Sequence, residues 1–118
     1  MICISEGQSK IRVDFSGNMN RKNILSIRDT ILNAVHPEIR KIEFHFDDVR
    51  QMDAPAMAMI VIIVKYLQSR KISSRVSGLT GDSKDLATVL GLHHLAEVEG
   101  KIKNSISRRR IKERRIQL

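Results

Sequence analysis

The sequence of 118 residues is poor in cysteine and in aromatic side chains. It has one cysteine, Cys3, three phenylalanines, one tyrosine and no tryptophan. A single cysteine cannot form a disulfide within the chain, and no Cys or His spacing typical of a metal site occurs. So few aromatic rings argue against a surface on which nucleic acid bases stack. We therefore expect a mainly aliphatic core and a reducing compartment.

Long apolar runs are also missing. The longest, residues 54–64, is well short of the roughly 18 to 20 residues that span a bilayer. The first residues lack the basic start and the apolar stretch of a secretory signal. We therefore expect a soluble cytoplasmic protein.

Motifs for catalysis are absent from the sequence as well. The glycines are scattered, and none has the spacing of a loop that presents successive N–H groups to a phosphate. His93 and His94 are adjacent, so on a helix they would point about 100° apart and could not face one metal ion. Asp47 and Asp48 have no partner motif and are interpreted as carboxylates at a strand end. We predict that the protein is not an enzyme and uses no cofactor or metal.

The net charge of +8 is concentrated at one end of the chain. Residues 101–118 contain eight basic side chains and one acid, which leaves residues 1–100 nearly neutral. We interpret residues 101–118 as a basic tail, either helical or disordered. It could bind anionic lipid or, through salt-sensitive phosphate contacts, nucleic acid. Its most basic part comprises Arg108, Arg109, Arg110, Lys112, Arg114 and Arg115.

The first half of the chain predicts two strands, a helix and a third strand. Apolar and polar residues alternate over residues 2–5 and 11–16, the period of half-buried strands, with a turn at residues 7–9 between them. Residues 24–35 have helical spacing, with Asn20 as candidate N-cap and His36-Pro37 as the end. Alternation over residues 42–47 then predicts a strand parallel to the preceding one.

The second half predicts a long apolar helix and shorter elements. Residues 54–69 contain a β-branched run, but their length favours a helix, with Asp53 as N-cap and Pro55 in its first turn. A short strand over residues 72–76 and a short helix ending at Gly91 follow. Leu95 and Val98 mark a last short element. The sequence thus predicts one α/β domain over residues 1–100, a mixed sheet of four to five strands with helices packed against it.

Three short motifs follow one another along the chain. They are Gly-Asn-Met-Asn at residues 17–20, Met52-Asp53 before the predicted long helix, and Leu-Gly-Leu at residues 90–92. In this order they resemble the STAS family, the domain shared by sulfate transporters and anti-sigma factor antagonists. The first is similar to that family's turn at a strand end, with Asn20 in place of an acid, the second to its apolar-Asp pair before the second helix, and the third to its Gly-Leu signature after the third helix. The resemblance covers about residues 2–100 and implies a STAS-like fold.

The resemblance also implies a protein-binding surface around the start of the second helix. Many relatives carry a hydroxyl there that a kinase phosphorylates, but Ala54 and Pro55 occupy these positions here. We therefore predict constitutive binding without phosphorylation at this helix start. We expect Met19, Pro55 and Met57 to form an adaptable apolar face, with burial of some Met side chains in the core as the alternative. The predicted partner-binding residues are Asn18, Met19, Asn20, Asp53, Ala54, Pro55, Ala56 and Met57.

Two functions are compatible with this resemblance. The first is a partner-switch component, similar to an anti-sigma factor antagonist, that binds a kinase-like anti-sigma factor. The second is an accessory subunit of a bacterial ABC transporter of the lipid-transport type, docked on the ATPase and peripheral to the inner face of the membrane. A binder of nucleic acid or membranes through the tail ranks third, and a homodimer is compatible with each.

Overall fold

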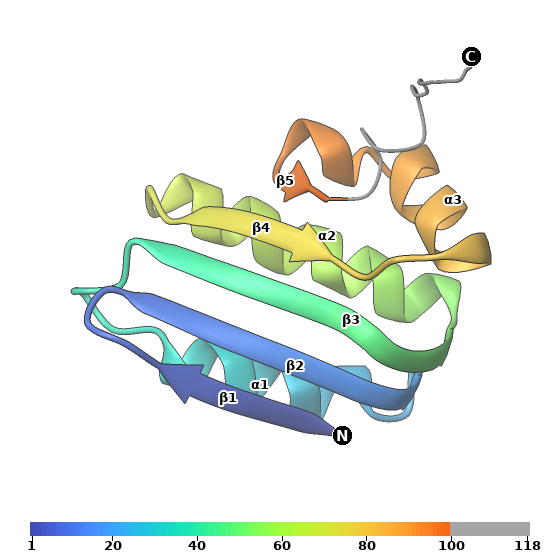
Figure 1. Cartoon of the computed structure of the whole chain (residues 1–118), viewed down its shortest axis with the longest axis horizontal. Helices are drawn as coiled ribbons and strands as arrows, with labels where there is room; N and C mark the ends of the chain where they lie inside the picture. The colour runs from blue at the N-terminus through green and yellow to red at the C-terminus, as the bar shows by residue number, and fades with distance from the viewer. Residues whose placement is uncertain (100–118) are drawn as a thin grey trace, which may run out of the picture.

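The computed structural model describes residues 1–99. Its sheet has five strands in the spatial order β1-β2-β3-β4-β5. Strand β1 runs antiparallel to β2, and the other neighbouring strands are parallel (Figure 1). The predicted mixed sheet is therefore confirmed, while the predicted basic tail lies outside the described residues. The strands are β1 (Ile2–Glu6), β2 (Lys10–Met19), β3 (Lys41–Met52), β4 (Ser73–Ser77) and β5 (Glu97–Val98).

The helices connect the parallel strands. Figure 1 shows α1 (Ile24–Ala34) and α2 (Ala54–Ser69) against the same face of the sheet, with α3 (Gly81–Val89) near the carboxyl end of β4. A short 3-10 helix, η1 (Leu92–His94), leads into β5. The prediction that residues 54–69 are helical is confirmed, and so is the prediction that Gly91 ends the α3 segment, since Gly91 has a φ of 79°. Such a left-handed conformation favours glycine.

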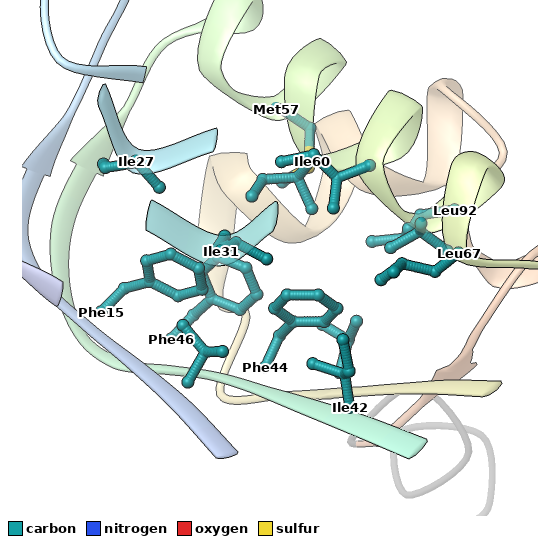
Figure 2. Close-up of a cluster of buried hydrophobic side chains, with 14 of the residues drawn as sticks. Phe15, Ile27, Ile31, Ile42, Phe44, Phe46, Met57, Ile60, Leu67 and Leu92 are labelled. Carbon is teal, nitrogen blue, oxygen red and sulfur yellow. The ribbon is translucent and has the colours of Figure 1, made fainter. Parts of the chain in front are cut away.

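The core lies between the sheet and the two long helices (Figure 2). Phe15, Phe44 and Phe46 project from β2 and β3, and the Phe15 and Phe46 rings stack with centroids 4.7 Å apart. The helices cover these rings with aliphatic side chains, as the sequence predicts. Those labelled in Figure 2 are Ile27, Ile31, Met57, Ile60 and Leu67.

Strands β2 and β3 extend beyond the alternating segments that predict them. Compared with its partner β2, β3 contains one extra residue between His45 and Asp48 and another between Val49 and Gln51. The register of the pairing therefore shifts twice. Each extra residue forms a β-bulge, which interrupts the period of two and bends the strand. Asp47 and Asp48 consequently lie within β3, and their placement at a strand end is wrong.

The start of α1 also differs from the prediction. Asn23, and not Asn20, is the N-cap residue of α1. The Asn20 side-chain oxygen instead accepts a hydrogen bond from the Lys22 N–H at 2.9 Å. The Asn20 backbone carbonyl accepts a second one from the Ile24 N–H, also at 2.9 Å. Asn20 therefore forms a turn between β2 and α1. Local side-chain bonding of this kind is what makes asparagine frequent both in turns and at caps.

The sheet face opposite α1 and α2 carries a polar network across three strands. On β3, Glu43 contacts the Lys10 ammonium of β2 at 3.4 Å and the His45 ring at 3.5 Å. His45 in turn lies 2.8 Å from the Ser77 hydroxyl of β4. The Glu43 side chain is only 15% exposed, so its charge is held within this network rather than in open solvent.

This network predicts an acid-sensitive contribution to stability from Glu43. Partial burial alone raises the pKa of its carboxyl, but the hydrogen bonds from His45 and Lys10 and the charges of Lys10 and Lys41 outweigh burial and lower the pKa below its ordinary value. A lowered pKa stabilises the folded protein at neutral pH, and this contribution is lost as the pH falls through the folded-state value. Urea unfolding from pH 7 to pH 3 is expected to show a shallower acid dependence for Glu43→Gln.

The matched control for this prediction is Glu38→Gln, because the Glu38 side chain is 85% exposed. The Glu38 variant is expected to keep the acid dependence of the unmodified chain. Equal acid profiles for Glu43→Gln and the unmodified chain would contradict the assignment of the effect to Glu43.

Candidate functional site

A concave pocket of about 630 Å³ lies at the carboxyl ends of β2 and β3. The carboxyl ends of parallel strands meet at one edge of a sheet, where the loops into the following helices also begin. Here that edge is bordered by the N-termini of α2 and α3. The residues that line the pocket are Asn18, Met19, Asn20, Val49, Arg50, Gln51, Met52, Asp53, Thr80, Gly81, Asp82 and Ser83.

Asp53 holds two walls of this pocket together. One carboxylate oxygen accepts a hydrogen bond from Ala56 N–H at 2.9 Å and so caps α2, as the sequence predicts. The other accepts from Arg21 N–H at 3.2 Å, in the turn between β2 and α1. The Asp53 N–H also donates to the Met19 carbonyl at 3.1 Å. The start of α2 and the β2–α1 turn are thus fixed relative to each other by one residue.

The asparagines of the β2–α1 turn complete this wall. The Asn23 side chain donates to the Asn18 carbonyl at 2.8 Å and accepts from Asn20 N–H at 3.0 Å. These bonds satisfy backbone groups that precede the first turn of α1. The turn therefore presents a defined shape to the pocket.

We expect Asp53→Ala to lower the free energy of unfolding by about 1 to 2 kcal/mol, because it removes the α2 cap and the bond to Arg21. Asp53→Asn keeps one side-chain oxygen for the cap and is expected to lose less than half as much. Urea unfolding followed by circular dichroism measures both changes. If Asp53→Ala proved as stable as the unmodified chain, Asp53 would not hold the start of α2 and the β2–α1 turn together.

The predicted partner-binding residues divide into lining, neighbouring and buried side chains. Asn18, Met19, Asn20 and Asp53 line the pocket, with the Met19 side chain itself buried. Ala54 and Pro55 are exposed and follow Asp53 directly. The prediction that Met19 and Met57 form an apolar docking face is wrong, since they are 1% and 0% exposed. Ala56 is also fully buried. These three side chains point into the core and support the surface from beneath.

The opposite wall of the pocket is provided by the start of α3 and was not predicted from the sequence. Thr80 and Ser83 bring hydroxyl groups there and Asp82 brings a negative charge, while Arg50 of β3 adds a positive charge to the lining. No motif marks residues 80–83 in the sequence. Their position could have been predicted from topology, because a loop that follows a parallel strand returns to the same edge of the sheet.

Within residues 1–99, no group of three or more His, Cys, Asp or Glu side chains could hold a metal ion. In the same part of the chain, no helix is long and apolar enough to cross a membrane.

Comparison with known proteins identifies the family of this chain. The family model of the STAS domain matches residues 5–108. The chain belongs to the STAS domain family. No curated protein matches this STAS domain in sequence.

Several solved structures share the fold of this STAS domain. The anti-sigma factor antagonist SpoIIAA in its unphosphorylated form has a TM-score of 0.68 and 12% sequence identity, over 94% of this chain and 100% of SpoIIAA. The phosphorylated form of SpoIIAA from Bacillus has a TM-score of 0.69 and 13% identity, over 93% and 100% of the two chains. A protein from Thermotoga maritima described as an anti-sigma factor antagonist has a TM-score of 0.71 and 14% identity, over 91% and 92%. At these identities the likeness confirms the predicted α/β, SpoIIAA-like fold.

Proposed function

We propose that this STAS domain is a protein-binding module and acts as a partner-switch component similar to an anti-sigma factor antagonist. Its binding surface is the pocket at the carboxyl ends of β2 and β3 together with the exposed start of α2 at Ala54 and Pro55. The observation that carries the proposal is the double role of Asp53, which caps α2 and bonds the β2–α1 turn. A surface fixed in this way is suited to binding, because little conformational freedom is lost when a partner docks.

The start of α2 offers no hydroxyl for phosphorylation. Ala54 and Pro55 are exposed, but neither can accept a phosphate, and Ala56 is buried. A phosphate at a helix N-terminus would be held by the free N–H groups and would add negative charge to the interface. We therefore infer that binding at this surface is constitutive. SpoIIAA, in contrast, is known in an unphosphorylated and a phosphorylated form.

Release of the partner by ATP distinguishes constitutive from switched binding. The complex is incubated with Mg²⁺ and ATP, and the retained partner and the intact mass of this chain are measured. We expect equal retention with and without ATP and no added phosphate. Release by ATP together with phosphate on Thr80 or Ser83, the hydroxyls of the pocket, would overturn the inference.

The partner itself is identified by capture on the full chain from a lysate that includes solubilised membranes. Recovery of a kinase-like anti-sigma factor would support a cytoplasmic partner-switch role in signalling and transcription regulation in a bacterium. Recovery of an ABC ATPase would instead favour the alternative, an accessory transporter subunit at the inner face of the membrane. The basic segment of residues 101–118 favours this alternative, because anionic lipid attracts such a segment.

Binding by the basic segment and formation of a homodimer are each tested by a separate experiment. Sedimentation with anionic vesicles and with nucleic acid at rising salt tests the basic segment, since phosphate contacts weaken steeply with salt. Analytical ultracentrifugation of the full chain tests for a homodimer. Neither result changes the proposed surface at α2, which is argued from residues 18–20, 49–55 and 80–83.

A further inference from the structure

The outer edge of β1 is open for pairing with another strand. The strand order places β1 at one edge of the sheet, and within residues 1–99 only β2 pairs with it (Figure 1). The opposite edge, β5, has only two residues. Proteins commonly protect long edges with lysine, proline or a bulge, but β1 contains neither residue type and pairs with β2 in unbroken register. The edge shares no residue with the proposed partner-binding surface, so an inference about it stands independently of that proposal.

The hydrogen bonds between β1 and β2 show which backbone groups face the open edge. Ser16 N–H donates to the Met1 carbonyl at 2.9 Å, and the Met1 nitrogen donates to the Ser16 carbonyl at 2.7 Å. At the other end of the strand, Gly7 N–H donates to the Lys10 carbonyl at 2.8 Å. Because bonded and outward-facing residues alternate in an antiparallel pair, the odd-numbered residues of β1 face β2 and the even-numbered ones face outward. The outward-facing residues are Ile2, Ile4 and Glu6.

A second copy of β1 fits this edge in one antiparallel register that uses all the outward-facing residues. In this register Ile4 pairs with Ile4 of the second copy, and Ile2 pairs with its Glu6. Each such pair exchanges two N–H···O bonds between the strands. Ile2 and Ile4 are half-buried and pack against the core, so a second copy would cover the area that they still expose. A shift of the register by two residues in either direction would leave outward-facing groups unpaired on both strands.

The charge on β1 favours the same arrangement. Glu6 is the only charged residue of the strand, and its carboxylate lies 2.5 Å from a ring nitrogen of His36. In the two-fold register the two Glu6 residues are separated along the strands by roughly 14 Å, beyond the Debye length of about 8 Å at physiological ionic strength. A parallel in-register pairing would instead place the two carboxylates side by side. A two-fold pairing also occupies both β1 edges, so association through β1 ends at the dimer.

We propose that two copies of this chain associate through their β1 strands, with Ile4 at the two-fold axis and one sheet continuing across the dimer. Strands of five residues bury less than the roughly 1,200 Å² of a stable interface, so the dimer is weak and reversible. The test is sedimentation equilibrium of the full chain in reducing buffer, from about 5 to about 500 μM. We expect a monomer–dimer equilibrium over this range. A chain that stays monomeric throughout would overturn the proposal.

Ile4→Pro tests the edge itself, because it removes an N–H that faces away from β2 and is not needed within the sheet. The variant is expected to raise the dissociation constant of the dimer about tenfold or more, since each copy loses one bond at the two-fold axis. Ile4→Val is the matched control, because valine is similar in size to proline and keeps the N–H. We expect it to stay within about threefold of the unmodified chain. Urea unfolding of dilute samples shows that both variants fold, and equal association of the two would overturn the proposal.

Disulfide formation tests the register without the proline variant. In the proposed register Cys3 lies opposite Ser5 of the second copy, with Cα atoms about 4.5 Å apart, and both side chains are exposed. We mix the unmodified chain with the double variant Cys3→Ser, Ser5→Cys, so that each chain has one cysteine. The mixed disulfide is expected to form faster than a disulfide within either pure sample, because like positions lie diagonally, about 7 to 8 Å apart. Equal rates in the mixed and pure samples would overturn the proposed register.

Discussion

Replacing Gly78 by alanine is expected to lower the free energy of unfolding by about 3 kcal/mol, through backbone strain and a steric clash together. Gly78 follows β4 directly and has a φ of 84°, a left-handed conformation that side chains rarely adopt. A Cβ atom at this position would lie 2.6 Å from the Asp47 backbone nitrogen. The clash is with backbone and cannot be relieved by a side-chain rotation.

The close approach at Gly78 also bears on the candidate site. Asp47 lies at the first bulge of β3, and the residues after Gly78 lead to Thr80 in the pocket wall. Pushing the two segments apart would therefore move this wall as well as destabilise the fold. Urea unfolding measures the loss of stability, and retention of the captured partner measures the displacement of the wall.

Gly17→Ala is the matched control for this prediction. Gly17 has a φ of 79°, yet a Cβ atom there would meet nothing within 4 Å. Only the backbone strain remains, and we expect a loss of about 1 to 2 kcal/mol. Equal losses in Gly17→Ala and Gly78→Ala would show that the contact with Asp47 contributes nothing.

The helices were predictable from the sequence because their signals are local. Asp53, Pro55 and the length of the apolar segment define α2, and the structure has a helix over the same residues. The carboxyl-terminal parts of β2 and β3 were not predictable. Their pairing depends on two extra residues in β3, and those residues destroy the alternation by which a strand is recognised.

The candidate site was predictable in part for the same reason. Asn18, Asn20 and Asp53 belong to motifs at strand ends, and they line the pocket. The burial of Met57 was not predictable, because α2 is apolar on nearly all sides and its composition does not indicate which side faces the sheet. The wall formed by residues 80–83 depends on the strand order, which brings the start of α3 to the same edge.

Placing a negative charge at the start of α2 is expected to reduce partner retention at least tenfold. Ala54 is exposed at the first helical position, so glutamate there is tolerated and even favoured by the helix dipole, by about 0.3 to 1 kcal/mol. Ala54→Glu should therefore fold with unchanged or slightly raised stability. A charge without a counterpart in an interface costs several kcal/mol, and 1.4 kcal/mol corresponds to a tenfold change in affinity.

Ala54→Gln has nearly the same size without the charge and separates electrostatic from steric effects. We expect it to retain at least a third of the partner bound by the unmodified chain, while Ala54→Glu retains less than a tenth. Equal losses in both variants would mean that the partner responds to bulk at Ala54 and not to charge. Full retention in both would mean that the partner does not contact the start of α2, and the surface assigned here would be wrong. Since neither variant alters the core or the Asp53 cap, a loss of binding with unchanged urea unfolding reports on the interface itself.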